Sequence, residues 1–121
     1  SFNCAMNSLC ALLGTTPGPV LDSAELRDLA IATAMESCDV AAAIGIEVDR
    51  DGLLKTLELV QREHRHHKPS MLVDFLAGRR TEIESLNGAV AALGGVHGVP
   101  TPRIQTLLAL VRAHESQYGR S

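Results

Sequence analysis

Apolar residues recur at helical spacing along most of the chain, and no stretch alternates as a half-buried strand would. The pattern predicts about six helices. The longest is rich in alanine, which lets other helices approach it closely. We therefore predict an all-α fold, a helical bundle around one long central helix. The predicted helices span residues 2–13, 23–44, 50–63, 70–77, 82–93 and 102–114.

Residues that favour helix ends mark the first boundaries. Asp22 or Ser23 can cap the long helix, and Gly45 suits the left-handed position at its end. Asp49 can cap the next helix. Residues 15–19, with two prolines and a glycine, are predicted to form a rigid loop. The predicted buried face of helix 50–63 carries Leu53, Leu54, Leu57 and Val60.

The segment after Gly78 has the pattern of a capping box, in which Thr81 accepts a hydrogen bond from a free helix amide and Glu84 reaches back. This pattern places Glu82 in the first turn of a helix, where the helix dipole favours a carboxylate. Asn87–Gly88 lies within the same helical pattern, so it predicts a place where a neighbour packs closely.

The last helix is predicted to begin with Thr101 as the capping residue and Pro102 at the first helical position. The polar tail from Glu115 onward is predicted to fray.

The composition limits the classes of function. The 121 residues suffice for one domain, 45% of them are hydrophobic, and only 2% are aromatic. A formal charge of −3 argues against a nucleic-acid partner, which requires a basic face. No apolar run approaches the roughly 18 residues of a membrane span, and no signal peptide is visible. Three cysteines without a Cys-x-x-Cys spacing indicate reduced thiols in a cytoplasmic protein.

Four polar residues are candidates for a site. Asn3 and Asn7 lie one helical turn apart, so their amides share a face, although exposed or mutually bonded amides are an equally simple interpretation. Ser70 and Glu82 each lie where a helix is predicted to begin, and either residue can serve as an ordinary cap or dipole partner.

His64, His66 and His67 form the most charged stretch together with their neighbours. His66 and His67 are adjacent and cannot share a helical face, and no carboxylate or cysteine completes a ligand set. We therefore predict a solvated helix end and no metal site, with a positive field near Ser70 that can attract an anionic substrate.

Several motifs together resemble the C-terminal domain of ketopantoate reductase (2-dehydropantoate 2-reductase). The family has an Asn-x-x-x-Asn-Pro/Ser-Leu helix, a Ser-Met-Leu-x-Asp turn, an Arg-Arg/His-Thr-Glu-Ile-Asp/Glu segment, Asn-Gly, and His-Gly-Val/Ile-x-x-Pro. This chain shows them in the same order, at residues 3–9, 70–74, 79–84, 87–88 and 97–102. The resemblance implies a 6-phosphogluconate dehydrogenase C-terminal-domain-like fold over residues 1–121.

The resemblance also implies roles for individual residues. Asn3 and Asn7 match the family's substrate-binding asparagines, and Ser70 matches the serine on the substrate's carboxylate side. Glu82 matches the glutamate that orients substrate and assists the catalytic lysine, and it is also a candidate for a contact with the cofactor. The family's lysine, the general acid, would lie one helical turn before Asn3, outside this chain.

The implied activity is the NADPH-dependent reduction of ketopantoate to pantoate, a step of pantothenate and coenzyme A biosynthesis. In this family an N-terminal Rossmann domain holds NADPH, so this chain would be a fragment that is inactive alone. Two alternatives remain open. One is a sister reductase of another 2-oxo acid, and the other is a non-catalytic helical interaction module. A homodimer is a further possibility.

Overall fold

The computed structural model describes residues 2–118, with the side chains from Cys4 onward, and it contains no strand within them. The all-α prediction is therefore confirmed. Seven α-helices and one π-helical turn follow one another along the described chain. They are α1 (Phe2–Leu13), α2 (Pro17–Asp22), α3 (Ala24–Ala43), α4 (Arg50–Glu63), α5 (Ser70–Leu76), η1 (Glu84–Gly88), α6 (Ala89–His97) and α7 (Pro102–Glu115).

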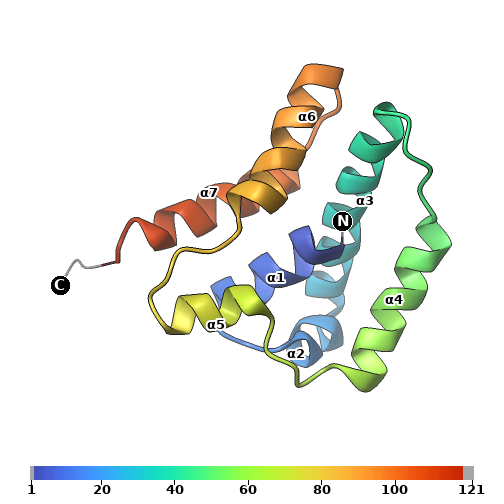
Figure 1. Cartoon of the computed structure of the whole chain (residues 1–121). Helices are drawn as coiled ribbons and strands as arrows, with labels where there is room; N and C mark the ends of the chain where they lie inside the picture. The colour runs from blue at the N-terminus through green and yellow to red at the C-terminus, as the bar shows by residue number, and fades with distance from the viewer. Residues whose placement is uncertain (1, 119–121) are drawn as a thin grey trace.

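The long helix α3 lies at the centre of the bundle together with α1 (Figure 1). Helix α3 packs against α1, α2, α4, α6 and α7, while α1 packs against α2, α3, α5, α7 and η1. Helix α4 lies at one side, where it contacts only α2 and α3 to any extent. The two central helices thus form the frame, and the outer helices are arranged around them.

The core is almost entirely aliphatic. One cluster joins α1 to α2, α3, α4 and α7, and a second joins α1 to α5, η1 and α7. Cys10, at the centre of the first cluster, is fully buried, and this burial raises the pKa of its thiol to about 12. The fully buried large aliphatic side chains include Val20, Leu57, Met71, Ile83, Ile104 and Val111.

Several helix ends follow local sequence signals. The Ser23 hydroxyl accepts a hydrogen bond from the amide of Leu26, and the Asp49 carboxylate accepts one from the amide of Gly52. Gly45 adopts a positive φ of 85° after α3, as the left-handed end of that helix requires. These ends are set by residues within a few positions along the chain, and each prediction about them is confirmed.

Two predictions about the region around α2 and α4 are wrong. Residues 17–19 belong to α2 rather than to a loop, because Pro17 occupies a first-turn position where its missing amide is not needed. On α4, Leu53 and Leu57 are buried as expected, but Leu54 is exposed. The apolar face of α4 is narrower than predicted because only α2 and α3 cover it.

The predicted capping box at Thr81 is also wrong. The Thr81 hydroxyl does accept a hydrogen bond from the amide of Ile83, but Glu84 turns away to pair with Arg112. The Glu115 carboxylate takes its place, accepting hydrogen bonds from the amide and the hydroxyl of Thr81 at 2.6 and 2.7 Å. The first helical turn is accordingly the π-helical η1, and Glu82 precedes it instead of lying inside a helix.

The tail from Glu115 is predicted to fray, but residues 115–118 do not, and residues 119–121 lie outside the described part of the chain. Glu115 is buried through its contact with Thr81. Tyr118 packs edge-on against His114, with 5.6 Å between the ring centroids. The described tail is therefore part of the packed structure as far as Tyr118.

Helix α7 begins at Pro102 as predicted, but its cap comes from another helix. The Thr101 side chain makes no capping bond, and its hydroxyl accepts from Gln105. The buried Glu36 carboxylate of α3 accepts instead from the amides of Arg103 and Ile104, at 3.0 to 3.1 Å. Helix α7 is thus fastened to α3 at its first turn.

The neighbour expected at Asn87–Gly88 is α7. Asn87 is fully buried, and its Nδ2 atom donates a long hydrogen bond of 3.5 Å to the carbonyl of Ile104. A close approach of backbone to a helical glycine occurs later, at Gly94 of α6. A Cβ atom there would lie 2.8 Å from the Val99 carbonyl oxygen and 3.0 Å from the Thr101 methyl group.

This contact makes Gly94 and Gly95 a matched pair for a stability measurement. Gly94→Ala is expected to destabilise the fold by about 1–3 kcal/mol, because the added methyl group forces the backbone at Val99 to move. Gly95→Ala is expected to stabilise it by about 0.5–1 kcal/mol, since nothing lies within 4 Å and alanine favours the helix. Urea denaturation of both variants checks the prediction, and equal effects would contradict it.

Candidate functional site

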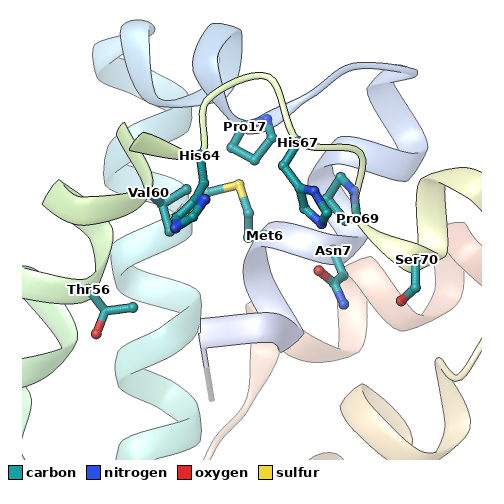
Figure 2. A pocket seen from close by; sticks show the side chains of 9 residues that line it. All are labelled: Met6, Asn7, Pro17, Thr56, Val60, His64, His67, Pro69 and Ser70. Carbon is teal, nitrogen blue, oxygen red and sulfur yellow. The ribbon is translucent and has the colours of Figure 1, made fainter. Parts of the chain in front are cut away.

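A cavity of about 650 Å³ opens between α1, α2, α4 and the start of α5 (Figure 2). Its size is that of a small-molecule site. Four elements and one connection supply its walls, so it depends on the whole N-terminal half of the fold. The lining residues are Met6, Asn7, Pro17, Thr56, Val60, His64, His67, Pro69 and Ser70.

Two of the four residues singled out by sequence meet at this cavity. Asn7 comes from the middle of α1, and Ser70 is the first residue of α5. In Figure 2 their side chains lie near each other at one end of the cavity. Helix α1 packs closely on α5, which explains how residues 63 positions apart in the sequence reach one site.

The other two sequence candidates lie elsewhere or cannot be placed. Asn3 precedes Asn7 by one turn on α1, but its side chain lies outside the described part of the chain. Glu82 does not line the cavity and is exposed between α5 and η1. Its neighbours are fixed, since Thr81 is bonded to Glu115 and Ile83 is fully buried.

Two histidines that the sequence reading assigned to a solvated helix end also line the cavity. They are His64, which ends α4, and His67. The amide of His67 donates to the carbonyl of His64 at 3.1 Å, so residues 64–67 form a tight turn. Both imidazoles point into the cavity in Figure 2, whereas His66 does not line it. His64 and His67 are three positions apart across a turn, and this spacing in the sequence would have distinguished them from His66.

The turn at residues 64–67 is attached to α2 through Arg65. The Arg65 carbonyl accepts a hydrogen bond from the amide of Gly18 at 2.8 Å, and its guanidinium pairs with Asp22 at 2.6 Å. The hydrogen bonds from Arg65, and then from Gln61, lower the pKa of the Asp22 carboxyl group. The turn that carries the two imidazoles is therefore attached to α2 by a residue that does not line the cavity.

The lining differs in character from one end to the other. Asn7, Ser70 and His67 lie at the polar end, and Met6, Val60 and Pro17 form an apolar wall. His64 lies beside Val60 at the apolar side in Figure 2. Such an arrangement can hold a small molecule with a polar head and a hydrocarbon body.

The part of the chain that the structure describes contains neither a metal-binding group of side chains nor a membrane-spanning helix. Within residues 2–118, no three His, Cys, Asp or Glu side chains are grouped so that they could hold a metal ion. None of the helices described is both long enough and apolar enough to cross a bilayer.

Comparison with known proteins identifies relatives of the chain. The family "Ketopantoate reductase PanE/ApbA C terminal" matches residues 1–115. The 2-dehydropantoate 2-reductase of Pyrobaculum aerophilum is 33% identical over 116 residues, which cover 96% of this chain and 41% of that protein. The chain thus spans about two fifths of the length of this relative.

Solved structures agree with this assignment. The 2-dehydropantoate 2-reductase of Methylococcus capsulatus superposes with a TM-score of 0.88 at 30% identity, covering 98% of this chain and 41% of that one. A D-mandelate dehydrogenase in a ternary complex with NADH and anilino(oxo)acetate superposes with a TM-score of 0.89 at 30% identity, covering 97% and 39%. The chain therefore belongs to the ketopantoate reductase C-terminal domain family.

Proposed function

We propose that this chain is the substrate-binding part of an NADPH-dependent 2-dehydropantoate 2-reductase, which reduces ketopantoate to pantoate. The observation that carries the proposal is the meeting of Asn7 and Ser70 at one end of a cavity of about 650 Å³. These residues were matched to substrate-binding positions of the family by motif alone. Their convergence from α1 and α5 supports that match.

The part of the enzyme that holds the dinucleotide would lie outside this chain. A Rossmann site needs parallel strands and a glycine-rich turn, and residues 2–118 form no strand. The described residues therefore do not form a dinucleotide site of their own, and they are proposed to act mainly on the substrate. We propose that an N-terminal Rossmann domain supplies NADPH, that the chain is inactive without it, and that the enzyme is cytoplasmic.

The chemistry assigned to this chain is binding and orientation. The Ser70 hydroxyl and the Asn7 amide can donate hydrogen bonds to the carboxylate and keto oxygens of a 2-oxo acid. The apolar wall of Met6, Val60 and Pro17 can take its hydrocarbon side chain. Holding the keto group in one orientation is what makes directed reduction possible. Asn3 and Glu82 keep the roles of substrate-binding and catalytic residues that the motifs imply.

A sister reductase of another 2-oxo acid is the second candidate. The similarity to a D-mandelate dehydrogenase, at 30% identity, favours this candidate because it shows the same domain in an enzyme with a different name. The apolar wall determines which side chain fits, so the choice between substrates belongs to Met6, Val60 and Pro17.

The test is NADPH oxidation by the full-length protein with ketopantoate, beside a panel of other 2-oxo acids that includes phenylglyoxylate. A clear preference for ketopantoate would support the first proposal. A preference for another acid would move the function to a sister reductase. No turnover of any acid by the folded protein would overturn both and favour an interaction module.

A further inference from the structure

We propose that His67 completes, with Asn7 and Ser70, a carboxylate-binding corner at the polar end of the cavity. The proposal rests on the proposed function, since it assigns a residue to the recognition of a 2-oxo acid. It extends that function by naming a substrate contact that none of the family motifs used above contains. Three features of the described residues support it.

The first feature is the direction of the imidazole. The turn closed by the hydrogen bond from the His67 amide to the His64 carbonyl brings both rings to the cavity side of the chain. Figure 2 shows the His67 ring on the side of Asn7 and Ser70, with His64 farther away beside Val60. His67 is therefore the histidine that can share a ligand with Asn7 and Ser70.

The second feature is the chemistry of the lining. Asn7, Ser70 and His67 can all donate hydrogen bonds, and no Asp or Glu is among the residues that line this cavity. Ser70 and His67 are exposed, and among the side chains described from Cys4 to Tyr118 neither of them is engaged in a side-chain hydrogen bond. Donors without partners and without a neighbouring carboxylate suit an anionic ligand, because hydrogen bonds to a charged group are the strong ones.

The third feature is the support behind the turn. Arg65 does not line the cavity, and it joins the turn to α2 through Asp22 and the amide of Gly18. Gly18 lies close to this turn, since a Cβ there would lie 3.1 Å from both the Cβ and the carbonyl oxygen of Arg65. Arg65 is thus a positioning residue for the turn that carries His67.

The experiment uses the full-length protein and compares the 2-oxo acid that it reduces best with the methyl ester of that acid. His67→Ala is expected to raise KM for the acid about tenfold, the effect of one charge-assisted hydrogen bond, with kcat changed much less. KM for the uncharged ester is expected to stay the same, so the preference for the acid falls about tenfold. His67→Gln retains a donor and is expected to recover most of the loss.

The matched control is His66→Ala, because His66 is exposed like His67 but does not line the cavity. We expect it to leave both KM values unchanged. A His67→Ala variant that behaves like His66→Ala, in a protein that reduces 2-oxo acids normally, would overturn the carboxylate assignment and leave the proposed function standing. Equal loss for the acid and the ester would also overturn it. No turnover by the unsubstituted protein would overturn the proposed function and this assignment together.

Discussion

Glu82→Ala in the full-length protein is expected to lower kcat for the 2-oxo acid about 100-fold or more, the range of a lost acid–base contribution. The Kd for NADPH is expected to change by less than about twofold, because Glu82 is assigned to the substrate side. The measurements are steady-state kinetics and NADPH binding followed by fluorescence.

The physical reason is the combination of a fixed backbone and an unengaged carboxylate. Thr81 is bonded to Glu115, and Ile83 is fully buried, so the two neighbours of Glu82 hold its position. Its carboxylate is exposed, and among the side chains described from Cys4 to Tyr118 it is not engaged in a hydrogen bond. A carboxylate that contributes nothing to the domain's own packing is available to a substrate or to the lysine that the family resemblance implies.

Glu84→Ala is the control for this prediction. Glu84 is also exposed and lies two residues later, but it pairs with Arg112, and this hydrogen bond lowers the pKa of its carboxyl group. Its loss is expected to leave kcat nearly unchanged. If Glu82→Ala weakened NADPH binding as much as it lowered kcat, or matched Glu84→Ala in both, the catalytic assignment of Glu82 would be wrong.

Glu36→Ala is expected to destabilise the fold by about 2–4 kcal/mol, the cost of leaving two helix amides without acceptors. Glu36 is only 6% exposed, and its carboxylate is the acceptor for the amides of Arg103 and Ile104. Ile104 is itself fully buried, so water cannot replace the lost acceptor there. The free energy of unfolding, measured by urea denaturation, checks the prediction.

Two further variants separate the cap from the ion pair. Glu36→Gln keeps one acceptor oxygen and is expected to lose about half as much stability. Arg103→Ala removes the partner guanidinium, which is half exposed, and is expected to cost less than about 1 kcal/mol. A larger loss for Arg103→Ala than for Glu36→Ala would show that the ion pair, and not the cap, fastens α7 to α3.

The sequence predicted the helix ends that depend on nearby residues and missed those that depend on distant ones. Ser23 and Asp49 cap helices through amides three positions away, so their patterns could be read directly. At Thr81 and Thr101 the same kind of pattern was present, but Glu115 and Glu36 supply the acceptors. A local pattern cannot show that a carboxylate from another helix occupies the position first.

The candidate site, too, could be predicted from the sequence only in part. The family motifs contained Asn7 and Ser70, and the structure brings both to one cavity. His64 and His67 are not part of the family motifs. Their place at the cavity could not be predicted, because the orientation of the two rings follows from a turn that is held in place by Arg65 and α2. The composition of the stretch around these histidines predicted only a basic, solvated segment. The distinction between His66 and its neighbours appears once the turn is formed.

The fastening of α7 has a consequence for the order of folding. The acceptor for the first turn of α7 lies 67 and 68 positions earlier in the chain, and its last turn is tied to a residue 34 positions earlier. Closing such long loops is slow compared with forming a helical turn. Helix α7 should therefore become stable only after α3 has formed, so substitutions at Glu36 should speed unfolding and leave the folding rate nearly unchanged.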